Sequence, residues 1–151
     1  MKIKLDETDF KILEILKEHS EYSTRKISKR ILVPITTVHH RIKKLKEAGV
    51  IKKFTIDVDY KKIDKGFLVY LLISTNLEFL KEKKKTQYDL LKELKKFYFV
   101  ERADIVTGGT DLVAIVRVKD VDEFDKVLLR KIQLIEGIEK TQSLIVIHSQ
   151  E

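Results

Sequence analysis

The spacing of apolar residues changes at Gly49, and this change limits the possible folds of the chain more than any other feature. Before Gly49 the apolar residues recur every three or four positions, as in helices, and after it they recur at about every second position, as in strands. Gly49 itself suits a helix C-terminus, because glycine adopts a left-handed backbone at little cost. The sequence therefore predicts a helical amino-terminal half followed by a half rich in strands.

Three short helices are expected before Gly49. Asp6 is a good N-cap for a first helix that runs to about Lys17, and Ser23 is an N-cap candidate for a second helix that runs to about Arg30. A tight turn, Leu32–Pro34, then leads into the third helix. Three helices with a tight turn between the second and third are typical of a helix-turn-helix unit.

The third helix has an apolar seam, formed by Val38, Ile42 and Leu45, and a polar, basic outer face. In a helix-turn-helix unit the third helix lies in the major groove of DNA, and its amino-terminal half contacts base edges. The predicted contacts to bases come from hydroxyl and imidazole side chains: Thr36, Thr37, His39 and His40. The predicted contacts to phosphates come from cationic side chains of the second and third helices: Arg25, Lys26, Lys29, Lys43 and Lys44.

Two of these assignments have a structural alternative. The pair His39–His40 is equally compatible with plain exposed helix surface, and metal binding by adjacent helical residues is disfavoured because they point about 100° apart. Arg41 stands beside the apolar seam, so it either contacts DNA or pairs with an acid of the first helix such as Asp9.

The positive charge is concentrated in the amino-terminal half. Residues 1–65 contain 17 Lys and Arg against 10 Asp and Glu, whereas residues 66–151 contain 14 of each, so the first half carries the whole net charge of +7. Within residues 22–53 the ratio is 10 to 1. This segregation indicates a polyanionic partner, double-stranded DNA, for the first half only.

A strand and a loop are expected to join the two halves. Residues 50–58 alternate in the manner of a strand, and residues 59–66 are polar and rich in lysine. The predicted organisation is a DNA-binding domain over residues 1–54, a linker strand and hinge over 55–66, and a further domain over 67–151.

The second half reads strand, helix, strand, strand, helix, strand. The strands are expected at 67–75, 100–107, 111–119 and 138–147, with a tight hairpin at Gly108-Gly109. Thr86 caps the first helix, and a capping box of Asp120 and Glu123 starts the second, which stops at Gly137. This order predicts an α+β chain whose second domain is a ferredoxin-like βαββαβ sandwich.

Several of these strands are apolar at nearly every position: residues 67–73, 112–116 and 144–147. A sheet that is apolar on both faces must be covered on both, and two helices cover only one. We therefore expect a second copy of the chain on the other face, in a homodimer. A dimer would also present two recognition helices to a pseudo-palindromic site.

Four stretches spread over the chain resemble the Lrp/AsnC (feast/famine) family of transcriptional regulators. They are Leu5–Asp9 with Ile12-Leu13, Val38–Ile51, Thr107–Asp111 and Gly137–Thr141. The resemblance implies a winged helix-turn-helix domain, a linker strand that pairs between subunits, and a ferredoxin-like domain that dimerises. It also implies assembly of dimers into octamers and binding of small effectors, commonly amino acids, between dimers.

The chain departs from this family at two places. Pro34 stands where the family usually has a serine N-cap, although proline also suits the first helical turn. In the effector loop Gly108 and Asp111 match, while Gly109 and Thr110 replace an acid and an aromatic residue. The loop could still hold an amino acid, with glycine N–H groups on its carboxylate and Asp111 on its ammonium. The predicted effector-binding residues are Thr107, Gly108, Gly109, Thr110, Asp111, Thr141, Gln142 and Ser143; the alternative is a hairpin turn and nothing more.

Composition narrows the remaining possibilities. The chain has no cysteine, so it has no disulfide, thiolate nucleophile or cysteine-ligated zinc, and we expect no metal or other cofactor. Its longest apolar run, Phe67–Ile73, is too short for a bilayer, which requires about 20 residues, and no signal-peptide core precedes it, so a cytoplasmic location and no membrane partner are expected. Two other functions compete with a sequence-specific regulator: a sequence-indifferent architectural DNA-binding protein, and an enzyme related to siroheme decarboxylases. The enzyme is disfavoured because the sequence shows no clustered histidines, cysteines or paired carboxylates that would form a catalytic site.

Overall fold

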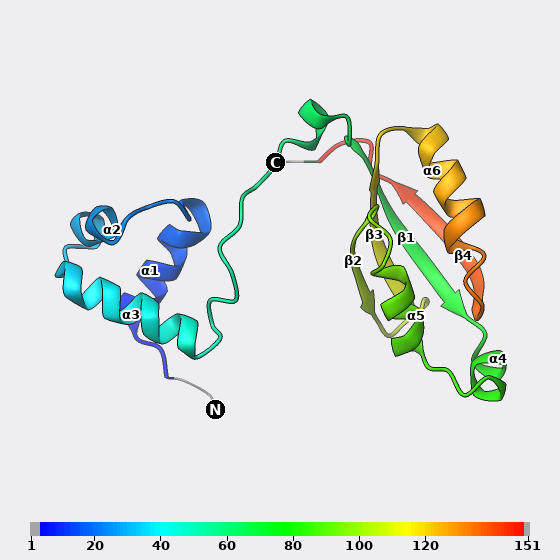
Figure 1. Cartoon of the computed structure of the whole chain (residues 1–151), viewed down its shortest axis with the longest axis horizontal. Helices are drawn as coiled ribbons and strands as arrows, with labels where there is room; N and C mark the ends of the chain where they lie inside the picture. The colour runs from blue at the N-terminus through cyan, green and yellow to red at the C-terminus, as the bar shows by residue number, and fades with distance from the viewer. Residues whose placement is uncertain (1–3, 150–151) are drawn as a thin grey trace. The chain divides into compact units, whose positions relative to one another are not determined.

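A computed structural model of the protein describes residues 4–149 (Figure 1). The chain divides into two compact units, residues 1–58 and 59–151, and each is described by itself. Among the described residues no helix is long and apolar enough to cross a membrane.

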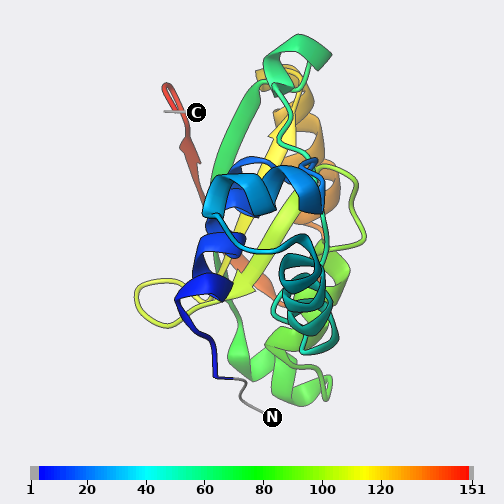
Figure 2. The same cartoon turned by 90° about the vertical axis from the view of Figure 1, so that its left-hand side faces the viewer.

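The first unit consists of three helices, α1 (Glu7–Glu18), α2 (Thr24–Ile31) and α3 (Ile35–Glu47), and Figure 2 shows them from the side. Asp6 and Asp9 cap α1 in a reciprocal capping box, and the Ser23 side chain accepts the N–H of Lys26 at the start of α2. Five buried apolar side chains from the three helices form the core: Ile12, Leu16, Ile27, Val38 and Leu45. The predicted helices and their caps are confirmed.

The turn between α2 and α3 is held by one side-chain bond and one unusual backbone conformation. The Ser28 hydroxyl donates to the Val33 carbonyl at 2.6 Å. Leu32 adopts a left-handed backbone, with φ of 58°, and the residue is 89% exposed. Pro34 occupies the N-cap of α3 without a side-chain bond, so the helix begins at Ile35.

The strand predicted over residues 50–58 is absent from the described structure. The N–H groups of Val50 and Ile51 both donate to the Leu45 carbonyl, which ends α3, and from 52 to 58 no bond joins backbone to backbone within residues 4–149. A strand exists only when a neighbouring strand shares its hydrogen bonds, and one chain supplies no neighbour here. Phe54 and Ile56 are consequently exposed, the latter by 79%.

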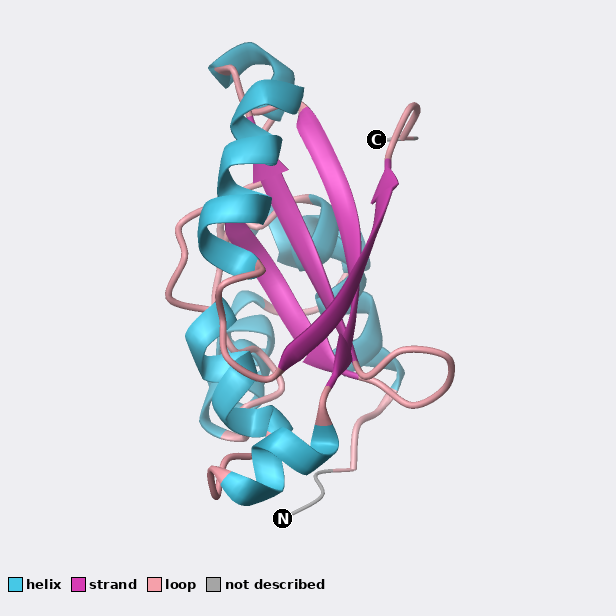
Figure 3. Ribbon diagram, turned by 90° about the vertical axis from the view of Figure 1, so that its right-hand side faces the viewer, coloured by secondary structure: helices cyan, strands magenta, loops and turns pink. Residues whose placement is uncertain are grey.

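The second unit is a four-stranded antiparallel sheet with the spatial order β2-β3-β1-β4 (Figure 3). Its elements follow a one-turn helix, η1 (Tyr60–Ile63). They are β1 (Phe67–Thr75), α4 (Leu77–Glu82), α5 (Gln87–Leu94), β2 (Val100–Ile105), β3 (Leu112–Val118), α6 (Val121–Val127) with the π-helical turn η2 (Leu128–Ile132), and β4 (Ile138–Ile145). The predicted α+β class and order of strands are confirmed, but α4 was not predicted.

One face of the sheet and the helices enclose the larger core. Val69, Leu71 and Ile73 of β1 pack there against Leu90 of α5 and Phe124 of α6, as part of a cluster of 17 buried residues. The unpredicted α4 joins this same core through Leu80. It therefore covers no part of the opposite face.

The predicted capping box of α6 is only half formed. Asp120 accepts the N–H of Glu123 at 2.9 Å, but the Glu123 carboxylate accepts the N–H of Lys119 instead of the N-cap N–H. The helix also ends before Gly137, whose backbone is left-handed with φ of 99°. A side chain at Gly137 would come within 2.6 Å of the buried Leu80.

The tight hairpin predicted at Gly108-Gly109 is instead a six-residue loop, 106–111. Its end is bonded to β1 as well as to the residue that follows β2. The Asp111 N–H and the Thr110 hydroxyl both donate to the Ile73 carbonyl, and the Asp111 carboxylate accepts two bonds from Thr75. The Asp111 carbonyl accepts the N–H of Val106, so the bonds that close the loop lie at residues 106 and 111 and not at Gly108-Gly109.

The face of the sheet away from α5 and α6, called here the outer face, is apolar at its centre. The register pairs Tyr70 with Leu144 and Ile115, and Leu72 with Val113. Tyr70 and Leu144 are 40% and 45% exposed, while the β3 side chains are half-buried. The prediction that the strands are apolar on both faces is confirmed.

Candidate functional site

Helix α3 is held by its seam and leaves its polar residues outside. Val38 and Leu45 are fully buried against α1 and α2, and Ile42 packs beside them. Because these residues fix one side of the helix, the other side is exposed: Thr36, His39, His40, Lys43, Lys44 and Lys46. Thr37 is half-buried.

Helical spacing arranges the exposed residues in two rows. Thr36, His40 and Lys44 follow one another at four-residue intervals, and His39, Lys43 and Lys46 form the second row. The second row lines a groove of about 320 Å³ together with Thr24 at the start of α2. Both rows run from hydroxyl or imidazole groups to lysines, the order in which base edges and phosphates would be met.

The predicted basic residues of α2 are exposed, but they are not equally free. Arg25 and Lys29 extend into solvent. The Lys26 ammonium lies 3.5 Å from the centre of the Tyr22 ring, in a cation–π contact, and the His19 ring stacks parallel to Tyr22 at 4.2 Å. Lys26 is thus engaged in a contact within the unit, unlike Arg25 and Lys29.

Arg41, predicted among the DNA contacts, is engaged in the fold. Its guanidinium donates to the Asp6 carboxylate and to both oxygens of Asp9 at 3.2 Å, and Asp9 is fully buried. The alternative, pairing with Asp9, is the one the structure has. The N–H of Asp9 and then the Arg41 guanidinium lower the pKa of Asp6, and the bond to Asp6 raises the pKa of Arg41.

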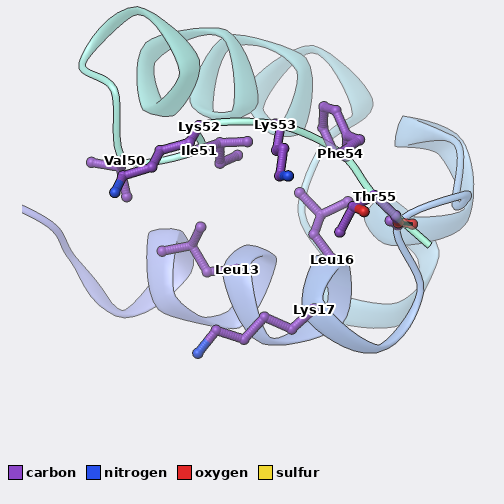
Figure 4. Close-up of a pocket in the computed structure, with 10 residues that line it drawn as sticks. Leu13, Leu16, Lys17, Val50, Ile51, Lys52, Lys53, Phe54 and Thr55 are labelled. Carbon is purple, nitrogen blue, oxygen red and sulfur yellow. Dashed lines mark hydrogen bonds between the residues drawn. The ribbon is translucent and has the colours of Figure 1, made fainter. Parts of the chain in front are cut away.

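An apolar groove of about 410 Å³ lies between α1 and the segment that follows α3. Figure 4 shows Leu13 and Leu16 on one side and Val50, Ile51 and Phe54 on the other. The groove is bordered by the extended segment that forms no backbone-to-backbone bond within residues 4–149, although the Thr55 carbonyl accepts a bond from the Ser20 hydroxyl at 3.0 Å.

The predicted effector loop lies beside a second cleft, of about 390 Å³, on the outer face of the sheet. This cleft, called here the loop cleft, is lined by Leu72, Ser74, Gly109, Thr110, Lys140 and Gln142. Asp111 does not line it. Its carboxylate accepts the N–H of Thr75 at 2.7 Å and the Thr75 hydroxyl at 3.0 Å, and Thr75 is only 6% exposed.

The predicted residues of β4 are divided between the two faces of the sheet. Gln142 pairs with Leu72 and shares its outer face, whereas Thr141 and Ser143 pair with the buried Ile73 and Leu71. The Thr141 hydroxyl accepts a bond from Gln133 at 2.9 Å. The single pocket predicted from Thr107, Thr141, Gln142 and Ser143 is therefore not formed in one chain, and Thr107 is exposed in the loop.

Sequence reasoning did not include Ser74 and Lys140, which complete the loop cleft. A signal existed, because the alternation of a strand places Lys140 and Gln142 on one face and Thr141 on the other. Within residues 4–149 no group of three or more His, Asp or Glu residues is placed to hold a metal ion.

Two family models match the chain. A model of winged helix-turn-helix DNA-binding domains matches residues 5–52, and the model of the Lrp/AsnC ligand-binding domain matches residues 72–150.

Known proteins that match nearly the whole chain are transcriptional regulators as well. An uncharacterised helix-turn-helix transcriptional regulator of Pyrococcus furiosus is 34% identical over 93% of this chain and 91% of its own. The structure of Escherichia coli AsnC is similar with a TM-score of 0.84 and 28% identity, over 97% of this chain and 95% of AsnC. A transcriptional regulator of Neisseria meningitidis, solved as a complex with L-methionine, has the same fold at a TM-score of 0.88, with 22% identity over 98% of this chain and 93% of its own.

Proposed function

The chain belongs to the Lrp/AsnC family of transcriptional regulators, and from this premise we propose that it is a dimeric, sequence-specific DNA-binding regulator that responds to a small effector. The observation that carries the proposal is the exposed face of α3, on which hydroxyl and imidazole groups precede a set of lysines. That face occurs in the unit that also holds most of the net positive charge of the chain, +6 of +7 over residues 1–58.

In the proposed complex α3 enters the major groove. Thr36, His39 and His40 contact base edges, and Lys43 and Lys44 contact phosphates, joined by Arg25 and Lys29 of α2. Arg41 acts indirectly: its bonds to Asp6 and Asp9 fix α3 against the start of α1. Its role is to position the helix that binds DNA.

Two features of the chain support a homodimer. Among the residues that the structure describes, no helix covers the apolar centre of the outer face, where Tyr70 and Leu144 are exposed, and an apolar sheet face of this kind is stable when a second sheet packs on it. Residues 52–58 form no backbone-to-backbone bond within residues 4–149, and most of their N–H and carbonyl groups have no side-chain partner there either, which suits strand pairing between subunits beside the apolar groove of Figure 4. Assembly of such dimers into octamers is proposed on the family resemblance alone.

The proposed effector is a small organic molecule, an amino acid or a related compound, bound at the loop cleft. The match of residues 72–150 to a ligand-binding domain supports this, as does a cleft bordered by Gly109 and Thr110 of loop 106–111. We also propose that the protein acts in the cytoplasm, where its DNA partner is, and that it binds without catalysing a reaction.

Footprinting on genomic DNA, including the protein's own promoter region, tests the proposal. Protection of one or a few discrete sites at physiological salt is expected for a regulator, because specific sites bind roughly 10³–10⁷ times more tightly than other DNA. Uniform protection at all sequences would contradict it and favour an architectural role. Light scattering on the same sample should give the mass of a dimer or a multiple of it.

A further inference from the structure

The loop cleft is built from the outer sides of two paired strands and the tip of the loop between β2 and β3. The register pairs Leu72 with Gln142 and Ser74 with Lys140, so these four side chains share the outer face. Gly109 and Thr110 close the cleft from the loop. The site therefore has one apolar wall, Leu72, and is otherwise polar.

Three polar side chains of this cleft, Ser74, Lys140 and Gln142, form no hydrogen bond or ion pair within residues 4–149. Within residues 4–149, Lys140 has no carboxylate within ion-pair distance. The N–H groups of residues 108–110 and the side chains of Ser74 and Gln142 likewise form no hydrogen bond to the described residues. A ligand in the cleft would meet an ammonium group, backbone N–H groups, a hydroxyl and an amide.

Asp111, the predicted partner of a ligand's ammonium group, is already hydrogen-bonded within the chain. Asp111 accepts two bonds from the buried Thr75, and the Thr110 hydroxyl donates to the Ile73 carbonyl at 2.9 Å. No carboxylate of the same chain lines the loop cleft; Glu139 lines a different cleft with Gln133 and Thr141, which Lys140 also borders. The ammonium of an amino acid in the loop cleft would lie near Lys140 with no opposite charge from the same chain, which is unfavourable between two cations.

We propose that the effector of this chain is a 2-oxo acid rather than an amino acid. A 2-oxo acid presents acceptors only, a carboxylate and a ketone oxygen, and these suit the unpaired Lys140 ammonium and the N–H groups of Gly109 and Thr110, while Ser74 and Gln142 can donate as well as accept. The carboxylate pairs with Lys140, the ketone oxygen accepts from loop N–H groups or the Gln142 amide, and the carbon chain lies along Leu72. This inference rests on the proposed function, since it names the effector class of the same cleft.

Matched pairs of ligands test the proposal on the full-length protein. Isothermal titration compares 2-oxoglutarate with glutamate and 2-oxoisocaproate with leucine, so that each pair differs only at the 2-position. We expect at least one 2-oxo acid to bind tenfold or more tightly than its amino acid, and to raise the melting temperature by mass action. Tighter binding of the amino acids would overturn the inference and leave the proposed regulator intact.

A variant locates the ligand. Lys140→Met should weaken 2-oxo acid binding tenfold or more while footprints without effector stay unchanged, and the matched control Lys95→Met, at an exposed lysine beyond α5, should bind as the parent does. Unchanged binding by Lys140→Met would overturn the assignment to this cleft. If neither ligand class binds at millimolar concentration, both the inference and the effector part of the proposed function are wrong, whereas discrete footprints would still support DNA recognition.

Discussion

The three-helix unit and the sheet unit differ in what they bury and in what they leave exposed. The first buries five apolar side chains in its core and exposes a basic helix, whereas the second has 17 buried core residues and exposes an apolar sheet face. The small core is supplemented by an ionic contact, Arg41 with Asp6 and Asp9. The comparison indicates that one exposed surface is suited to a polyanion and the other to a second copy of the chain.

The largest expected effect tests whether the two cores are independent. Leu45→Ala removes a fully buried side chain from the five-residue core and should cost about 2–5 kcal/mol. The matched variant Leu90→Ala removes an equally buried leucine from the sheet unit. Amide hydrogen exchange, measured as the temperature is raised, should show that each variant destabilises only its own unit. Simultaneous loss of protection in the three-helix unit and the sheet unit would mean that the two units unfold together.

The second prediction concerns the outer face. Tyr70→Lys places a charge at its centre, opposite Leu144, and should convert the dimer to monomer at micromolar concentration because a buried unpaired charge is costly. Tyr88→Lys, at a 68% exposed position on α5, is the control and should leave the dimer intact. Light scattering distinguishes the two, and a Tyr70→Lys dimer would place the interface elsewhere.

The third prediction tests the basic helix. Lys43→Ala with Lys44→Ala removes two exposed cations from α3 of each chain and should weaken DNA binding, with the salt slope of a dimer reduced by about 4. The control, Lys92→Ala with Lys96→Ala, removes two lysines from or next to α5 of the sheet unit and should change neither quantity. Equal effects of the two double variants would contradict the division of charge between the units.

The smallest expected effect compares two capping carboxylates. The pKa of Asp6 is lowered by the N–H of Asp9 and by Arg41, and that of Asp89 by the N–H and hydroxyl of Thr86. Each therefore stabilises its unit above the unfolded pKa of 3.8, and this stabilisation is lost as the pH falls through the lowered folded value. Asp6→Asn keeps a capping oxygen but not the charge.

In melting experiments from pH 7 to pH 2, Asp6→Asn should lower the melting temperature of the three-helix unit at pH 7, and the difference from the parent should shrink below pH 3.8 and disappear once the pH is below the lowered pKa of folded Asp6. Asp89→Asn should do the same for the sheet unit. A difference for Asp6→Asn that is independent of pH would show that its charge does not stabilise the fold.

Most of the fold could be predicted because local signals and the periodicity agreed. The caps Asp6, Ser23 and Thr86, the buried seam of α3 and the bounds of β1 all follow from neighbours in sequence. The prediction of a strand over 50–58 was wrong for the single chain, because a strand forms only beside a partner strand and the periodicity of a segment does not show whether one is present. The short helix α4 has only six residues, too few for a clear amphipathic pattern.

The candidate sites were predicted less completely, for a related reason. The exposed residues of α3 followed from its seam, but the bonds of Asp111 to Thr75 join positions 36 apart and have no local signature. In contrast, the alternation of side chains along a strand could have predicted that Thr141 and Ser143 lie on one face of the sheet and Gln142 on the other.

The segment from residue 52 to residue 58 has a consequence for how a dimer would select its target. It forms no backbone-to-backbone bond within residues 4–149, and at about 3.3–3.6 Å per residue its seven residues reach roughly 25 Å when extended. Once one helix of a dimer is bound, the length of this segment, whether extended alone or paired with its copy, sets how far the second helix can reach and its effective concentration at each neighbouring half-site. A shorter or longer segment would therefore alter the spacing between half-sites that is tolerated, without changing the bases that either helix prefers.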